Sequence, residues 1–330
     1  MHKNAFNGSI QVAVVGGAGY SGLELCRILR RHPFVNLVAT FGTKDIAEIW
    51  KRTSEFQVVF LATPAEVSLE LAPKLLNHGL HVIDLSGAFR LNTENISADY
   101  QQWYGFTHSE TELVKKAHYG LVPWAKPIVS DEAVLISNPG CYATAILMGL
   151  LPLLKNNLII EETLVIDAKS GTTGAGKKAV ESQIFSEVEG ECLPYKTGVH
   201  QHLPEITLFS KLLGGKKIDP FLSTSLLPVR RGIIAGLYAR MLPGKNLQDV
   251  DYAFKEFYGN YPFVSSGLSL KKVVGTPTTQ ISYSLVGDKM YLYSSLDNLL
   301  KGAASQAIEN FNLLNNLPVE TGLTYLEAMI

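Results

Sequence analysis

A glycine-rich turn between a buried strand and a helix constrains the fold of this chain more than any other feature. Residues 10–15 read IQVAVV, a short β-branched run, and residues 23–32 continue as LELCRILRRH at helical spacing. The turn between them, GGAGYSG, carries two overlapping patterns, Gly17-x-Gly19-x-x-Gly22 and Gly16-x-x-Gly19-x-x-Gly22. Such a turn lets the backbone approach a pyrophosphate at the start of the helix, and its strand-to-helix context favours dinucleotide binding over a structural turn.

The strands and helices that follow predict the rest of a first domain. We expect strands at residues 35–42, 57–64 and 81–86, with a helix at 65–79 between the last two. Strands that alternate with helices over this length indicate an α/β fold with a Rossmann-type, doubly wound parallel sheet.

The second part of the chain has a different character. After a helix at 141–154, strand-like runs at 163–170, 221–229, 232–242, 278–287 and 289–296 include several with period-two alternation. They predict a second, α+β domain over 141–296 with a mixed or largely antiparallel sheet. An amphipathic helix at 297–314 is expected to pack back on the first domain, residues 1–140, and residues 297–330 to complete that domain.

Composition excludes several classes of function. A formal net charge of −1 gives no basic surface for nucleic acid, and no apolar run is long enough for a membrane span. Three scattered cysteines are too few for a disulfide framework or a zinc site. We therefore expect a cytoplasmic enzyme without a metal that acts on a small molecule.

The cofactor is expected to be NADP(H). No acidic residue ends the second strand, where NAD-specific folds bind the ribose; Thr43 and Lys44 lie there instead, and Asp45 comes slightly late. A hydroxyl and an ammonium suit a 2′-phosphate. The predicted cofactor-binding residues are Gly16, Gly17, Ala18, Gly19, Tyr20, Ser21, Gly22, Thr43, Lys44 and Gly174.

Cys141 is the candidate nucleophile. It follows Pro139 and Gly140 and begins a helix between the two domains. A helix N-terminus favours a thiolate, so we expect a lowered thiol pKa, and the preceding glycine leaves room for a substrate carbonyl. Cys26 is expected to lie in the core, and Cys192 has no assignment. A thiolate beside a nicotinamide suggests attack on an activated acyl group followed by hydride transfer.

Two histidines are candidates for the acid/base group. His200 and His202 lie in YKTGVHQHLPEI, and on an extended segment they would face opposite ways. Glu205 follows His202 by three residues, so we expect its carboxylate to orient that imidazole. Tyr195 is a possible neighbour in the same loop.

A second glycine loop raises an alternative of another class. Gly171, Gly176 and Lys177 follow a strand and resemble a phosphate-binding P-loop, which would indicate a nucleotide phosphohydrolase. Lys178 stands where Ser or Thr should hold magnesium, so we expect the segment to form a wall of the catalytic cleft instead.

Arginine and polar residues near the strand ends are expected to bind the substrate. Arg90 follows the fourth strand, where ligands gather in doubly wound sheets, and it could grip a phosphate or carboxylate. Ser86 could add a hydroxyl, and Arg231 is a weaker candidate. Asn138 and Tyr195 complete the predicted substrate site.

Taken together, these segments resemble the N-acetyl-gamma-glutamyl-phosphate reductase family, within the wider group that includes aspartate-semialdehyde dehydrogenase. The resemblance covers nearly the whole chain and rests on GGAGYSGLEL, IDLSGAFR, SNPGCYATA, SGTTGAGK, HQHLPEI and DNLLKGAASQAIENFN. It implies NADPH-dependent reductive dephosphorylation of an acyl phosphate, with Cys141 as nucleophile, the histidine pair as acid/base and Arg90 near the substrate. It also implies a homodimer or homotetramer. His202 is preferred over His200 because Glu205 lies one turn from it.

The chain departs from the family pattern in two places, and alternatives stay open. Residues 41–57 are contracted, and Gly17 and Ala18 stand where family members often carry Ala and Ser. A related reductase acting on a carrier-bound aminoadipyl phosphate or on aspartyl phosphate is an alternative substrate class. A non-catalytic NADP-binding homologue is another.

Overall fold

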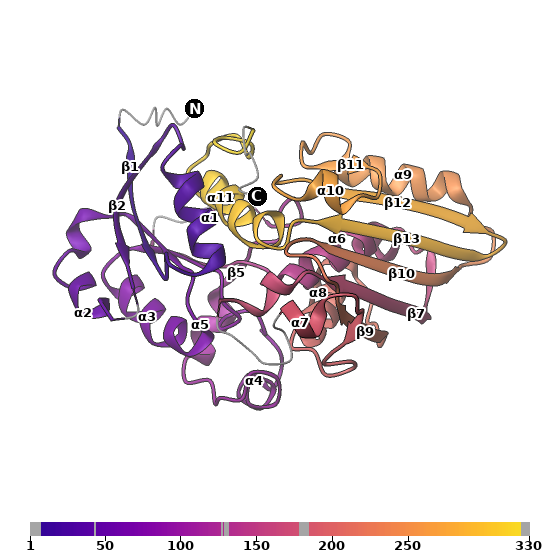
Figure 1. Cartoon of the computed structure of the whole chain (residues 1–330), viewed down its shortest axis with the longest axis horizontal. Helices are drawn as coiled ribbons and strands as arrows, with labels where there is room; N and C mark the ends of the chain where they lie inside the picture. The colour runs from indigo at the N-terminus through magenta and orange to yellow at the C-terminus, as the bar shows by residue number, and fades with distance from the viewer. Residues whose placement is uncertain (1–7, 43, 127, 129–131, 178–184, 325–330) are drawn as a thin grey trace.

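The computed structural model describes residues 8–42, 44–126, 128, 132–177 and 185–324, and these form two β-sheets that lie side by side. Figure 1 shows the first sheet with its helices on the left and the long strands of the second sheet on the right. The α/β class predicted from the sequence is confirmed.

The first sheet is parallel throughout, in the order β2-β1-β3-β4-β6-β5. Its strands are β1 (Ile10–Val15), β2 (Val35–Phe41), β3 (Val58–Leu61), β4 (His81–Asp84), β5 (His118–Tyr119) and β6 (Leu135–Ser137). The first four match the predicted strands, whereas β5 and β6 are too short to show a pattern. The strand order reverses between β1 and β3, since β2 lies on one side of β1 and the later strands lie on the other. Ligands of doubly wound sheets bind at such a switch point.

The helices of this first unit follow the strands. They are α1 (Tyr20–Leu29), α2 (Ile46–Ile49), η1 (Thr53–Glu55), α3 (Ala65–Asn77), α4 (Ile96–Tyr104) and α5 (Thr111–Lys116). The expected helices α1 and α3 bury one face each, while α4 and α5 were not predicted. In the contracted region between β2 and β3, the short α2 and η1 take the place of a full crossover helix.

The second sheet is mixed, as predicted, in the order β11-β12-β13-β10-β7-β9-β8. Its two parallel pairs are β11 with β12 and β7 with β9, and the other pairs are antiparallel. The strands are β7 (Ile159–Ser170), β8 (Leu193–Pro194), β9 (Phe221–Leu226), β10 (Ile233–Met241), β11 (Val264–Ser266), β12 (Thr279–Val286) and β13 (Lys289–Leu296).

A buried helix, α6 (Cys141–Lys155), packs against β10 and β13 of this sheet and against two further helices. Residues 142–154 of α6 are all buried, which explains why CYATAILMGLLPLL shows no polar face. The further helices are α8 (Leu203–Gly214) and α9 (Leu247–Tyr258), neither of them predicted, and the shorter elements are η2 (Thr172–Ala175), α7 (Phe185–Val188) and α10 (Leu270–Val273).

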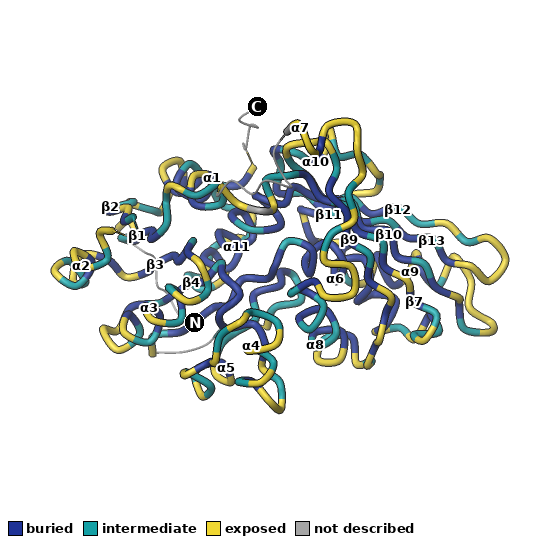
Figure 2. Tube along the Cα trace, turned by 60° about the horizontal axis from the view of Figure 1, so that its bottom comes forward, coloured by how far each residue is buried: buried dark blue, intermediate teal, exposed yellow. Residues whose placement is uncertain are grey.

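The predicted C-terminal helix consists of two parts, the π-helix η4 (Leu300–Ala304) and α11 (Ser305–Leu314). Both pack against α1, and α11 also contacts β4, so this segment returns to the first unit. Figure 2 shows this region in dark blue, as a buried centre between the two sheets. No helix in the described part of the chain is long and apolar enough to cross a membrane.

Candidate active site

A cavity of about 910 Å³ opens at the carboxyl ends of β1, β3 and β4 and reaches the start of α6. Its walls come from the first glycine turn, the loops after β3 and β4, the loop after β7, the segment before α8 and the start of η4. Segments from both sheets therefore meet around one space, at the place where the switch between β1 and β3 predicts a ligand.

One end of the cavity has the features of a dinucleotide site. Gly19, Tyr20, Ser21 and Gly22 line it, and these residues form the N-cap and first turn of α1, whose amides have no acceptor within the helix. Gly16 has φ +84°, and a Cβ there would lie 2.2 Å from the carbonyl oxygen of Ala62. Only glycine permits this approach of the turn to β3. The residues present therefore fit a bound pyrophosphate.

Other predicted cofactor residues are divided between lining and supporting positions. Gly174 lines the cavity, as does Lys177, whose Nζ donates to the carbonyl oxygen of Ala18 at 3.4 Å. Gly17 and Ala18 belong to the turn but not to the cavity wall. Lys44 is exposed outside the wall, and Thr43 lies outside the described residues. Asp45 accepts a hydrogen bond from the amide of Gly42 at 3.1 Å, so it closes the turn after β2.

Cys141 begins α6 and is half-buried at the cavity wall, between the two sheets. Burial raises the pKa of its thiol to about 11, although Arg90 and the backbone N–H of Tyr142 act in the opposite direction. The lowered pKa expected from the helix start is wrong for this state, because removal from water outweighs the helix N-terminus. At neutral pH the thiol holds its proton and needs a base.

His202 is the imidazole next to Gly140, the residue directly before Cys141. It is the N-cap residue of α8, and its Nε2 packs so closely on Gly140 that a Cβ there would lie 2.4 Å away. Its Nδ1 is buried and has no hydrogen-bond partner among the described residues. Burial lowers the pKa of His202 well below its ordinary value, helped by the nearby charges of His200 and Arg90. A neutral imidazole therefore lies against the residue directly before the cysteine.

His200 lies beside His202 rather than opposite to it. The two rings have centroids 4.8 Å apart and both line the cavity, because residues 200–202 form a turn and not the extended segment assumed from the sequence. The backbone N–H of His202 donates to His200 Nδ1 at 3.1 Å. Since Nδ1 accepts, a neutral His200 carries its proton on Nε2. Burial lowers its pKa to about 4.

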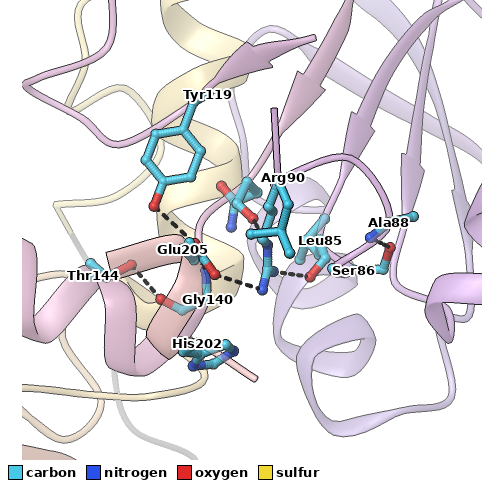
Figure 3. A network of polar contacts seen from close by, with 12 residues as sticks. Leu85, Ser86, Ala88, Arg90, Tyr119, Gly140, Thr144, His202 and Glu205 are labelled. Atoms are coloured by element: carbon cyan, nitrogen blue, oxygen red, sulfur yellow. Dashed lines mark hydrogen bonds and ion pairs between the residues drawn. The ribbon is translucent and has the colours of Figure 1, made fainter. Parts of the chain in front are cut away.

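Glu205 does not orient His202, which corrects the prediction from their spacing. Figure 3 shows its carboxylate among Tyr119, Gly140 and Arg90, with His202 on the other side of Gly140. Oε1 accepts from the Tyr119 hydroxyl and from the Gly140 amide, both at 2.8 Å, and Oε2 lies 3.4 Å from Arg90 Nη1. Helix α8 turns Glu205 away from His202, towards the residue that precedes Cys141.

Arg90 lines the cavity but is largely occupied by protein atoms. Its Nε donates to the carbonyl oxygen of Asn138 and its Nη2 to that of Leu85, each at 2.9 Å, in addition to the ion pair with Glu205. Ser86 also lines the cavity, and its hydroxyl donates to the buried carboxylate of Asp84 at 2.7 Å. Both residues brace the loop after β4.

The remaining predicted substrate residues separate into two groups. Tyr195 lines the cavity and its hydroxyl donates to that of Tyr142 at 2.9 Å. The Asn138 amide is directed elsewhere, with Nδ2 on the carbonyl oxygen of Ala303 at 3.2 Å, so only its backbone serves the site. Arg231 is absent from the cavity wall and pairs with Glu24 of α1 at 2.6 Å and with the buried Asp297 at 2.9 Å.

The loop after β7 is not free to cradle a phosphate as a P-loop does. The amides of Gly171, Thr172 and Thr173 donate to the carbonyl oxygens of Gly232, Val229 and Arg230 at 2.9–3.1 Å. Amides that already have partners cannot bind a phosphate, and Lys178 lies outside the described residues. The segment is a cavity wall, as expected.

Sequence reasoning missed several residues at the site. Tyr119 comes from the two-residue strand β5, and Lys196 and Asn298 line the cavity from loops. Asn298 belongs to the segment DNLLKGAASQAIENFN of the family resemblance, whereas Tyr119 and Lys196 stand in none of those segments. Only the folding of distant segments brings them together. Among the described residues, no three His, Cys, Asp or Glu side chains form a group suited to a metal ion.

Comparisons with known proteins give the chain its relatives. Residues 46–131 match the semialdehyde dehydrogenase NAD binding domain, and residues 141–298 match the semialdehyde dehydrogenase dimerisation domain. N-acetyl-gamma-glutamyl-phosphate reductases from Geobacillus kaustophilus (strain HTA426) and Bacillus cereus (strain AH187) are 39% and 38% identical, over 96% of this chain and 99% of theirs.

Solved structures share the fold. Aspartate semialdehyde dehydrogenase II complexed with ASA from Vibrio cholerae superposes with a TM-score of 0.72 at 15% identity, over 93% of this chain and 98% of that one. A probable aspartate-semialdehyde dehydrogenase from Pseudomonas aeruginosa gives 0.65 at 17% identity, over 93% and 98%.

Proposed function

The chain belongs to the N-acetyl-gamma-glutamyl-phosphate reductase family, and we propose that it works through a thioester on Cys141. It is an NADPH-dependent oxidoreductase that converts N-acetyl-gamma-glutamyl phosphate to N-acetyl-glutamate 5-semialdehyde and phosphate. The observation that carries the covalent scheme is the close packing of His202 Nε2 on Gly140, which puts a neutral imidazole against the residue directly before Cys141, the only cysteine in the cavity wall among the described residues.

His202 serves as the base that makes Cys141 reactive. The thiol keeps its proton at neutral pH, and the neutral imidazole accepts that proton as the sulfur attacks the acyl carbon. The bond from the acyl carbon to the phosphate oxygen then breaks and phosphate leaves. The first-turn amides of α6, which have no acceptor within the helix, stabilise the oxyanion that forms on the way.

When bound, NADPH supplies the hydride that reduces the thioester, and its pyrophosphate would lie on Gly19, Tyr20, Ser21 and Gly22. His202 then protonates the product oxygen, or assists release of the aldehyde when the carbon–sulfur bond breaks. Neutral His200, whose Nδ1 accepts from the backbone, has an N–H at Nε2 available to the substrate. Glu205 and Arg90 act through position, because Glu205 ties the amide of Gly140 to the loop after β4.

The assay runs the reaction backwards, with N-acetylglutamate semialdehyde, phosphate and either NADP or NAD. We expect NADP reduction that depends on phosphate, and weaker reduction of NAD. The Cys141→Ser variant should lose at least about 10³-fold in rate, as expected for removal of a nucleophile, and should still bind NADP. Substantial activity in that variant would rule out the thioester, whereas activity without phosphate would rule out the acyl-phosphate reaction.

We also propose the domain boundaries and the oligomeric state of the protein from its match to the family. Residues 1–140, completed by 297–330, form the NADP-binding domain, and residues 141–296 form the catalytic and oligomerisation domain. The match to a dimerisation domain supports a homo-oligomer, and we propose a homodimer or homotetramer in the cytoplasm. Sedimentation of the purified protein tests its size.

A further inference from the structure

Lys196 has an unusual backbone conformation at the cavity wall. Three described residues other than glycine have positive φ, namely Asn157, Asn316 and Lys196. Asparagine adopts this region readily, whereas lysine does so at a cost. Lys196 has φ +46° and, unlike the two asparagines, lines the cavity. A strained residue persists only where its surroundings enforce it, and such residues gather at functional sites.

The neighbours of Lys196 hold it in this conformation. The amide of Tyr195 donates to the carbonyl oxygen of Thr224 at 2.9 Å, and the amide of Gly198 donates to that of Leu222 at 3.0 Å. Both acceptors belong to β9. The carbonyl oxygen of Lys196 accepts from the amide of Val199 at 3.0 Å, which closes a tight turn directly before His200. The turn is therefore fixed to the second sheet on both sides of the lysine.

The cavity has few cations to offer a substrate. Among the described residues that line it, the lysines and arginines are Arg90, Lys177 and Lys196. Arg90 is paired with Glu205 and bound to two carbonyl oxygens. Lys177 reaches the glycine turn at the cofactor end. Lys196 is exposed at the end with the histidines, and its charge acts on both His200 and His202.

We propose that Lys196 binds the phosphoryl group of the acyl-phosphate substrate and pairs with the phosphate as it leaves. This rests on the proposed function and adds a residue to it. When the sulfur of Cys141 bonds to the acyl carbon, the carbon–oxygen bond breaks and phosphate keeps the electron pair. The ammonium balances that charge without a proton transfer. The phosphate is attached to the reacting carbon, and the substrate carboxylate is further away, so a cation beside the two histidines meets the phosphate.

The test measures both substrates of the reverse reaction in wild type and in Lys196→Met. Loss of one charge-assisted hydrogen bond should raise the KM for inorganic phosphate about 10- to 100-fold. The KM for the semialdehyde should change less than about twofold on the same reasoning, since its contacts remain. Lys196→Arg should restore much of the phosphate affinity. Lys211→Met, on the exposed side of α8, is the control for loss of one lysine charge.

A second measurement does not depend on turnover. Inorganic phosphate should slow alkylation of Cys141 by iodoacetamide in wild type, and much higher phosphate should be needed in Lys196→Met. Lys196→Asn suits the positive φ and gives the same test if the methionine variant is unstable. A raised KM for the semialdehyde with unchanged KM for phosphate would overturn the assignment in favour of the carboxylate. No phosphate dependence in wild type would instead refute the proposed function itself.

Discussion

Two buried carboxylates in this molecule have almost the same chemical partners. Glu205 pairs with Arg90 and a tyrosine hydroxyl, that of Tyr119. Glu309 pairs with Lys301, both of its oxygens lying 3.0 Å from Nζ, and accepts from the hydroxyl of Tyr261. Both carboxylates are fully buried. Each cluster thus contains one acid, one cation and one phenol.

The surroundings of the two clusters differ. Glu205 also holds the amide of Gly140, directly before the proposed nucleophile Cys141, and its cation Arg90 lines the cavity. The Glu309 cluster joins the C-terminal segment to Tyr261, and its Lys301 also donates to the carbonyl oxygen of Val122 at 3.1 Å; none of its members lines the cavity. The same chemistry should therefore serve catalysis in the first case and stability in the second.

The largest expected effect is the loss of stability when the Glu309 cluster, which lies outside the cavity wall, is disrupted. Lys301→Met leaves Glu309 buried without its cation, and removal of one partner from a buried pair costs about 3–5 kcal/mol of unfolding free energy. Urea unfolding followed by fluorescence measures it. We expect kcat of the folded variant to stay within about tenfold of wild type, since no catalytic group moves more than slightly. A stability unchanged from wild type would contradict this role.

Breaking the cluster at the cavity should mainly affect the reaction. Glu205→Gln removes the charge that faces Arg90 and loosens the link to Gly140, and a small displacement of a reacting group costs about 10²-fold in kcat. Steady-state kinetics at a temperature well below unfolding gives the value, with cofactor affinity as the control. If Lys301→Met lowered kcat as much as Glu205→Gln, the proposed difference between the clusters would be lost.

Replacing both Lys301 and Glu309 should nearly restore stability. In Lys301→Met combined with Glu309→Leu, no charge is left buried, and such replacements are often neutral or stabilising. We expect a free energy of unfolding within about 1 kcal/mol of wild type, compared in the same urea series with Lys301→Met alone. A double variant as unstable as the single one would mean that Val122 or Tyr261, not the charge pair, dominates.

The smallest effect concerns the pH dependence of Cys141. Burial raises the pKa of its thiol to about 11, and the negative charge of Glu205 adds to the rise. Alkylation of the free enzyme should therefore be slow at neutral pH and accelerate as pH rises through that value, where the thiolate forms. Glu205→Gln should shift the alkylation profile to lower pH, and Lys301→Met should leave it in place. A wild-type midpoint near neutral pH would contradict the proposed need for His202 as base.

Much of the fold could be predicted because, in many elements, the local pattern of apolar residues agrees with the structure that forms. The first four parallel strands, α1, α3 and α6 each carry a continuous apolar run or face, bounded by glycine or by a change of period. The elements that escaped prediction include β5 and β6, with two and three residues, which are too short for periodicity to appear. The C-terminal segment was expected as one helix, but its first turn is a π-helix beside the cavity.

The candidate site was predictable where its residues stand next to glycines and strand ends. Cys141 after Pro139 and Gly140, and the histidine pair, were identified from sequence, and all line one cavity. The partners of these residues were not predictable. Glu205 lies three positions after His202, yet α8 directs it to Arg90, 115 residues earlier in the chain. Sequence spacing cannot tell which way a side chain leaves an unpredicted helix.

By itself, the sequence determined the chemistry that this protein has available: a nucleotide turn, a cysteine at a helix start and two imidazoles. These depend on residue type and on local backbone, which neighbouring residues dictate. Only the tertiary structure decided how the groups are charged and paired. Burial raised the pKa of the Cys141 thiol and kept His202 neutral, and both shifts depend on exclusion of water by residues from both sheets. The same packing fixed Lys196 in its strained turn at the cavity wall.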